Sequence, residues 1–161
     1  MANEKEVRIR IKSVRYEVEE SLFSDEKDRI VAGEEAPVEP ETVRINTLGT
    51  MTVGDGRVEI RYEETKATGM DGSTTAVTYM LEQPEVVSMI REGTVSTALV
   101  FESGKRHHCV YRTPIMPFEV CVRTIRVENR LMDTKTLMLD YVVEIRGARA
   151  ERTKFYMELL S

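Results

Sequence analysis

The sequence predicts an all-β fold, a closed antiparallel up-and-down barrel of roughly 8–10 strands. Apolar residues recur at every second position through most of the chain, turn residues interrupt this pattern at short intervals, and no amphipathic helix separates the segments. Tight turns favour up-and-down connection because parallel pairing needs long crossovers, and closure removes the edge strands that promote aggregation. We expect residues 1–161 to form a single domain.

The first expected strand carries one basic face. Apolar and basic residues alternate over 7–12, and the apolar positions change phase at Val14, so we expect a β-bulge near Lys12 and Ser13. Gly54-Asp55-Gly56 predicts a tight hairpin, since glycine and aspartate tolerate positive φ. Gln83-Pro84 predicts a later turn. The other expected strands lie at 43–53, 57–63, 73–81, 85–91, 95–101, 107–112, 118–127, 136–145 and 151–160.

Charge is distributed unevenly along the chain. The segment from Glu17 to Glu41 contains ten acidic residues and only two basic ones, Lys27 and Arg29. The net charge of the whole chain is −5, so the remaining residues carry a net charge of +3. The acidic total argues against a nucleic-acid partner. Residues 19–41 also contain Pro37 and Gly33, and we expect them to form a partly disordered loop or a lid over one barrel mouth.

Cysteine content and the N-terminal residues favour a cytoplasmic protein. The chain has only Cys109 and Cys121, which indicates reduced thiols and not a disulfide framework. If Tyr111 and Phe118 both face inward, Cys109 lies opposite Val120 and Cys121 lies on the outer face. No hydrophobic leader or apolar run long enough for a membrane span is present, so we expect no membrane partner.

No residue pattern predicts a metal, a cofactor or a catalytic site. In a strand, adjacent His107 and His108 point to opposite faces, so they cannot bind one ion together, and nothing completes a set with His107 and Cys109. His107 is the single best candidate if the protein is an enzyme. Glu63 and Glu64 resemble a carboxylate pair, but adjacent strand positions diverge, so we expect solvated surface acids.

Aromatic residues that alternate into the expected interior suggest a ligand site. A barrel of this size can hold one small ligand, and tyrosine hydroxyls suit a polar head group. Arg91 ends an apolar strand and offers a counter-charge, although an ion pair at the rim with Glu92 or Glu119 is the alternative. The inward aromatic set also includes Phe101 and either Phe155 or Tyr156. The candidate ligand-binding residues are Tyr62, Arg91, Tyr111, Phe118 and Tyr141.

A series of short motifs resembles a known family. They are Gly54-Asp55-Gly56, Tyr62-Glu63-Glu64, Thr74-Thr75, Arg91-Glu92-Gly93, Phe101-Glu102-Ser103-Gly104, Tyr111-Arg112-Thr113-Pro114, Thr124 and Leu139-Asp140-Tyr141. This order is similar to that of the YwiB-like family of small bacterial proteins, a domain-of-unknown-function family. The resemblance implies a calycin-like barrel, similar to lipocalins and fatty-acid-binding proteins, and transfers no catalytic residue. Where the family places a glycine after Thr-Pro, this chain has Met116-Pro117.

The sequence therefore favours a non-catalytic binding module that takes a small apolar or anionic ligand in the barrel interior or mouth. The alternative is a solid barrel that binds another protein through its outer surface or the acidic loop, and a homodimer fits either role. An enzyme is the least favoured class, because no titratable group is marked out by its surroundings.

Overall fold

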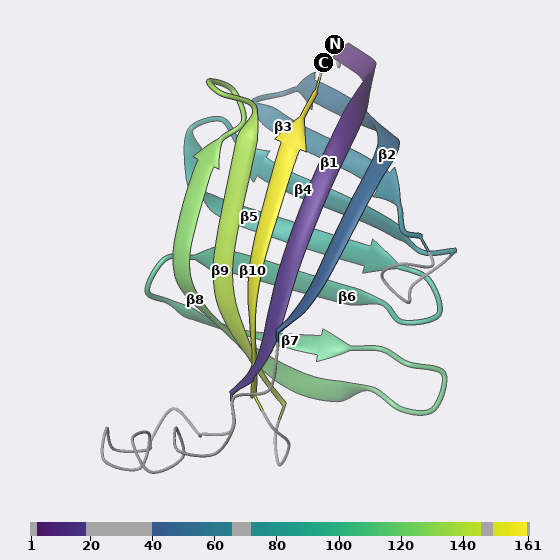
Figure 1. Ribbon diagram of the computed structural model, residues 1–161, viewed down its shortest axis with the longest axis vertical. Helices are drawn as coiled ribbons and strands as arrows, with labels where there is room; N and C mark the ends of the chain where they lie inside the picture. The colour runs from purple at the N-terminus through teal and green to yellow at the C-terminus, as the bar shows by residue number, and fades with distance from the viewer. Residues whose placement is uncertain (1–2, 19–39, 66–71, 146–149, 161) are drawn as a thin grey trace.

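The computed structural model describes residues 3–18, 40–65, 72–145 and 150–160, and within these ranges the regular structure consists of ten antiparallel strands in a nearly closed barrel (Figure 1). This confirms the predicted fold class. The strands are β1 (Asn3–Val18), β2 (Glu41–Gly54), β3 (Arg57–Glu63), β4 (Thr74–Met80), β5 (Gln83–Glu92), β6 (Thr97–Glu102), β7 (Arg106–Tyr111), β8 (Phe118–Arg130), β9 (Thr136–Ile145) and β10 (Ala150–Leu159).

The strand order is β6-β5-β4-β3-β2-β1-β10-β9-β8-β7, so chain neighbours pair throughout and β1 joins β10 in the middle of the sheet. The two edges, β6 and β7, meet at a seam. One isolated bridge between Ser96 and Arg112 closes one end of this seam. At the other end the β6–β7 turn bonds to β8, where Gly104 donates to the Thr124 carbonyl and Thr124 donates to that of Lys105. The seam is thus held at both ends.

Strand β1 runs without interruption between its two neighbours. Its register is continuous with β2 from Asn3 to Arg15 and with β10 from Ile9 to Val18. The predicted bulge at Lys12 and Ser13 is therefore wrong, and Arg15 stays in phase with the inward residues. The register shifts lie elsewhere, between Thr78 and Met80 in the β4–β5 pair and between Thr124 and Arg126 in the β8–β9 pair.

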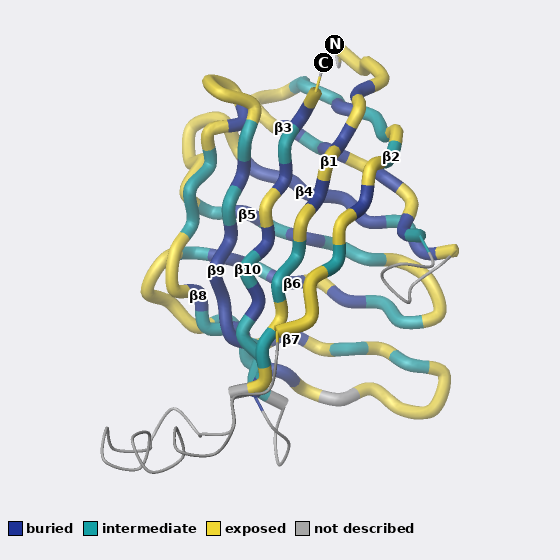
Figure 2. Tube along the Cα trace, viewed as in Figure 1, coloured by how far each residue is buried: buried dark blue, intermediate teal, exposed yellow. Residues whose placement is uncertain are grey.

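Inward positions form one continuous core, visible as the alternating buried residues of Figure 2. Ile60, Phe101 and Leu139 are completely buried. Phe155 is the inward member of its pair, whereas the neighbouring Tyr156 is 40% exposed. The period-two pattern therefore identified the core face of these strands, as expected when one face of each strand is buried.

The turns agree with the sequence in one place and differ in another. Asp55 and Gly56 adopt φ values of 56° and 73° in the β2–β3 hairpin, which confirms the predicted turn. The predicted turn at Gln83-Pro84 is wrong, because both residues belong to β5 and the turn lies at 81–82. Pro84 has no partner in the ladder to β4, so its missing N–H costs no pairing there.

The cysteines occupy the predicted positions. Cys109 lies opposite Val120 and Cys121 lies opposite His108, and both thiols are free. Most of the acidic 19–41 segment, residues 19–39, lies outside the described residues. Among the residues that are described, none belongs to a helix with the length and hydropathy needed to cross a membrane.

Candidate functional site at the polar end of the barrel

The two ends of the barrel differ in how the chain connects the strands. At one end β2–β3, β4–β5, β6–β7 and β8–β9 are joined by short turns, and the β1 and β10 termini lie there too (Figure 1). At the other end lie the last residues of β1, β3, β5, β7 and β9 and the first residues of the strands that follow them. We call the first the apolar end and the second the polar end, because of the inward side chains that follow.

Along each of several strands, the inward residues change from apolar to polar toward the polar end. On β5 the buried Met89 precedes Arg91, and on β3 the buried Ile60 precedes Tyr62 and Glu64. β1, β4, β6 and β10 show the same change from apolar to polar inward residues. Their inward polar residues at this end are Arg15, Thr75, Thr97 and Thr153, respectively. The interior is therefore amphipathic along the barrel axis.

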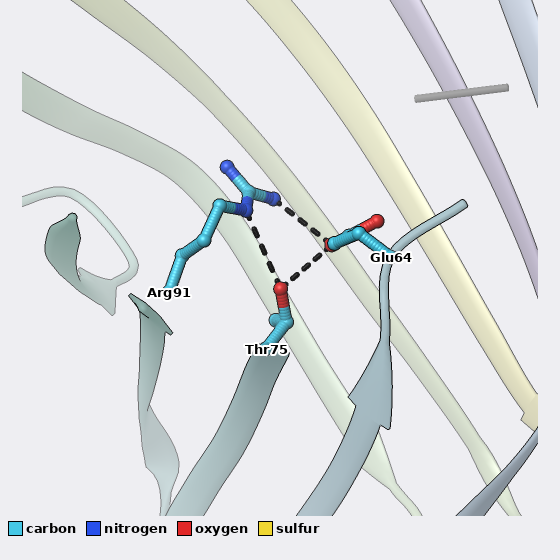
Figure 3. Close-up of polar contacts among 3 residues, drawn as sticks. All are labelled: Glu64, Thr75 and Arg91. Carbon is cyan, nitrogen blue, oxygen red and sulfur yellow. Dashed lines mark hydrogen bonds and ion pairs between the residues drawn. The ribbon is translucent and has the colours of Figure 1, made fainter. Parts of the chain in front are cut away.

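Three of these residues form a hydrogen-bonded network across β3, β4 and β5 (Figure 3). Thr75 Oγ1 donates to Glu64 Oε1 over 2.6 Å. The Arg91 guanidinium donates from Nε to Thr75 Oγ1 and from Nη2 to Glu64 Oε1, each over 3.3 Å. The side chains of Glu64 and Arg91 are only 2% and 17% exposed, so this is a buried ion pair with a shared hydroxyl.

This network overturns two sequence predictions. Glu64 is not a solvated surface acid, and the partner of Arg91 is Glu64, not Glu92 or Glu119. The strand register explains both corrections. Thr75 pairs with Tyr62 on one side and with Arg91 on the other, and the Glu64 amide donates to the Ser73 carbonyl, which extends the β3–β4 pairing by one step. Glu64 therefore follows Tyr62 into the interior at the two-residue period of a strand.

Three tyrosines surround the network and stay protonated at neutral pH. Burial raises the pKa of Tyr62 well above its usual range, and the nearby Glu64 carboxylate raises it further. Burial raises the pKa of Tyr141 to about 12 and also raises that of Tyr111. The charge of Arg91 acts on all three in the opposite direction, with a smaller effect, so the guanidinium lies within electrostatic reach of each hydroxyl.

A second ion pair lies at the same end. Arg15 Nε is 3.9 Å from Glu151 Oε2, and both side chains are almost half exposed. Their charges also act on Tyr111. Deeper in the barrel, the ring centroids of Tyr141 and Phe101 are 4.5 Å apart and the rings are tilted by 49°, and Phe101 pairs with the buried Val87. Tyr141 thus links the charged groups of the polar end to the apolar interior.

The structure brings four of the five predicted ligand-binding residues together. Tyr62, Tyr111 and Tyr141 converge on Arg91, while Phe118 pairs with Tyr111 in the β7–β8 ladder and its side chain lies outside the described part. Whether these residues bind a ligand stays a prediction. Sequence analysis missed the inward polar residues Glu64, Thr75, Thr153, Arg15 and Glu151. The signal was available in the phase of each strand, since each residue continues its strand's inward series.

The remaining chemistry of β7 lies away from this network. His107 Nε2 is 3.6 Å from Glu102 Oε1, and Lys105 Nζ is 2.9 Å from the other oxygen of that carboxylate. The Cys109 thiol lies 3.9 Å from the His107 carbonyl oxygen, and burial raises the pKa of that thiol. Across the described ranges, His, Cys, Asp and Glu side chains nowhere gather in threes that could hold a metal ion.

Comparison with known proteins relates the chain to a family and to one solved fold. A family model described as "Domain of unknown function (DUF1934)" matches residues 27–157. No curated protein matches the chain. The crystal structure of the ywiB protein from Bacillus subtilis is similar, with a TM-score of 0.66 and 16% sequence identity over 98% of this chain and 94% of that chain. At this identity the likeness supports the fold alone.

Proposed function

The chain belongs to the DUF1934 family, as its resemblance to YwiB-like proteins indicated, and we propose that it is a non-catalytic binding module. The ligand is a small molecule with an anionic head group and an apolar part, held at the polar end of the barrel. The observation that carries this proposal is the largely buried Arg91 guanidinium, which Glu64 and Thr75 hold in one orientation at this end of the barrel.

The principal donor to the ligand is the Arg91 guanidinium. Within the described part of the chain, Nη1 of Arg91 has no hydrogen-bond partner, because the network uses only Nε and Nη2. Burial raises the pKa values of Tyr62 and Tyr141, so their hydroxyls stay protonated at neutral pH, and each also interacts with a threonine hydroxyl, of Thr75 and Thr153 respectively. A carboxylate or phosphate presents several acceptor oxygens and suits this arrangement.

The anionic partner of Arg91 enters the network through one carboxylate oxygen. Oε1 of Glu64 accepts from both Thr75 and Arg91, and the ion pair holds the guanidinium in one orientation. A buried ion pair is not an efficient way to stabilise a fold, since apolar residues of equal volume do as well or better. A pre-oriented arginine is instead what a binding site requires.

The apolar part of the ligand has a wall to pack against. Tyr141 packs against Phe101 deeper in the barrel, and buried Leu139 and Val122 lie on β9 and β8. An apolar lining with a few convergent polar groups is the usual composition of small-molecule sites. A non-catalytic role is supported by the protonated state of the buried hydroxyls and of the Cys109 thiol, since deprotonated groups are the better nucleophiles.

The test combines native mass spectrometry with a side-chain NMR titration. Protein purified under non-denaturing conditions is expected to carry a stoichiometric extra mass that is lost on denaturation. Sodium hexanoate and hexyl phosphate are then titrated into ligand-free protein, and the Arg91 Nε–H resonance is followed. The two probes distinguish a carboxylate from a phosphate head group.

The matched variants are Arg91→Gln and Arg57→Gln. Arg57 is exposed at the β2–β3 hairpin, at the far end of the barrel, so its loss leaves binding unchanged. Loss of binding in Arg91→Gln alone supports the proposal. Bare chain mass together with an unmoved Arg91 resonance in both titrations overturns it.

The alternative function, binding of a partner through the outer surface, has its own support. Two grooves lie on the outer wall of the barrel, lined by β1 and its neighbours. They involve side chains that point away from the polar-end network, so the two functions are separable by mutation.

A further inference from the structure

The outer wall carries two grooves that meet over β1. The first, of about 430 Å³, is lined by residues of β1, β8, β9 and β10. The second, of about 770 Å³, is lined by residues of β1 and β2 together with Glu63 of β3 and Leu160. Arg10 lines both. Together they form one surface across six neighbouring strands, which we call the outer groove.

The outer groove is bordered by basic side chains without ionic partners. The basic residues in or beside it are Arg8, Arg10, Lys12, Arg44, Arg130 and Lys154. Within the described part of the chain, none of the six forms an ion pair. Of the acids that line it, Glu128 is paired with Arg126, while Glu158 lies opposite Arg10 and Glu63 is exposed. The balance of free charge is positive.

This arrangement costs stability. Lys12 lies directly opposite Arg44 in the β1–β2 ladder, and like charges at opposed positions destabilise a sheet. On its other side Lys12 lies over the Tyr156 ring, with Nζ 5.9 Å from the centroid. Within the described part of the chain no acidic side chain pairs with Lys12 or Arg44, so the basic surface is left available to a partner.

Apolar side chains are exposed among these charges. Leu48 is 57% exposed, Tyr156 40% and Leu160 37%, and each lines one of the two grooves. A purely electrostatic surface has no need of them. Mixed basic and apolar character fits a partner that carries both acidic and apolar side chains, because each part of the partner finds its complement.

We propose that the outer groove binds an acidic peptide segment of a partner protein, with acidic side chains on Arg8, Arg10, Lys12 and Arg130 and apolar side chains on Leu48, Tyr156 and Leu160. The binding is independent of the ligand at the polar end. A single-stranded nucleic acid fits less well, because its binding depends on stacking successive bases and Tyr156 is the one aromatic residue that lines the two grooves.

The test measures fluorescence anisotropy with three labelled probes on the full chain. They are a short peptide of glutamate and leucine, the same peptide with glutamine in place of glutamate, and an oligothymidylate of equal charge. We expect the acidic peptide to bind, and its affinity to fall as ionic strength rises from about 0.05 M to about 0.5 M, because salt screens exposed charges. The glutamine peptide and the oligothymidylate are expected to bind more weakly.

The variants are Arg10→Glu, Lys12→Glu and the matched control Arg57→Glu, an equal charge change on an exposed residue outside both grooves. Arg10→Glu and Lys12→Glu each weaken peptide binding about tenfold, whereas Arg57→Glu changes it less than about twofold. Urea midpoints close to that of the parent show that the variants remain folded. Binding that is equally affected in all three, tighter binding of the oligothymidylate, or no binding of the acidic peptide overturns the proposal.

Discussion

The apolar and polar ends of the barrel interior are built from the same strands but stabilised differently. Toward the apolar end, inward residues such as Val58, Val87 and Leu137 are almost completely removed from water. Toward the polar end, the same strands bury Glu64 and most of Arg91, whose burial is tolerated only because they pair. Burial of apolar surface drives folding, whereas a buried ion pair at best breaks even.

The contrast separates the part of the barrel that holds the fold from the part that is free to serve a function. The apolar end contributes stability in proportion to buried area, so substitutions there report on packing. The polar end contributes little net stability, so substitutions there report on pairing and binding. Four predictions test this division, in order of decreasing effect.

The largest effect is expected from a cavity toward the apolar end. Ile60 is completely buried, and Ile60→Ala removes its packing, at a cost of about 4 kcal/mol in the free energy of unfolding. Leu48→Ala, at a position 57% exposed, is the matched control and costs less than about 1 kcal/mol. Urea unfolding of both variants measures the difference. Similar losses in the two would show that the interior is not the stabilising core.

A slightly smaller loss is expected from breaking the buried pair at the polar end. Arg91→Met leaves Glu64 without its cation and lowers the free energy of unfolding by about 3 kcal/mol. This loss is smaller than that for a fully buried pair, because the Arg91 side chain is 17% exposed. The double variant Arg91→Met/Glu64→Leu removes both charges and recovers most of this stability. A double-mutant cycle in urea measures the coupling. If the double variant is no more stable than Arg91→Met, the pair itself stabilises the fold and the division between the ends fails.

The buried tyrosines make stability fall at high pH. Because burial raises the pKa of Tyr141 from 10.0 to about 12, the unfolded chain loses this proton first as pH rises. Its contribution is complete below pH 10.0 and is lost as pH approaches 12, with a slope of up to about 1.4 kcal/mol per pH unit. In Tyr141→Phe, the free energy of unfolding from urea titrations falls less steeply between about pH 9.5 and 11.5, by roughly this slope. The exposed control Tyr156→Phe keeps the pH dependence of the parent. An equal slope in both variants would contradict the assignment.

The smallest effect is expected from an exposed ion pair. Arg61 Nη2 lies 3.2 Å from Glu59 Oε1, but the arginine side chain is 53% exposed. Arg61→Ala therefore changes the free energy of unfolding by less than about 0.5 kcal/mol. The comparison with Arg91→Met isolates burial as the variable, since the chemical partners are of the same type. A loss as large as that of Arg91→Met would show that burial does not set the energy of these pairs.

Much of the barrel was predictable because its signals are local. Alternation assigned the inward faces of β2, β3 and β7, and the register placed Cys109 opposite Val120 as expected. The turn at Asp55 and Gly56 followed from the backbone freedom of aspartate and glycine. Such features depend on residues close in the chain.

The phase of each strand marks the inward polar residues of the polar end, but which of them meet was not predictable, because that depends on the register of separate strands. Glu64 and Arg91 meet only when β3, β4 and β5 are aligned. The phase of β1 was misjudged for a related reason. Val14 and Tyr16 looked like inward residues, but Tyr16 faces outward. The Arg152 guanidinium lies over the Tyr16 ring, 6.0 Å from the ring centroid, and donates hydrogen bonds to Asp140. An apolar ring can thus be covered from outside the barrel.

The pairing of β1 with β10 has a consequence for how the chain folds during synthesis. Of the ten strands, β1 is synthesised first, yet its hydrogen-bonded neighbour on one side, β10, is synthesised last, roughly ten seconds later at typical elongation rates. Without β10 the strand order consists of two separate sheets, β1–β6 and β7–β9. The edge strands β1 and β9 of these sheets both lack β10 as their hydrogen-bonded neighbour. Insertion of β10 between them is the event that turns two sheets into a barrel, so we expect nascent chains lacking it to be the form that chaperones recognise.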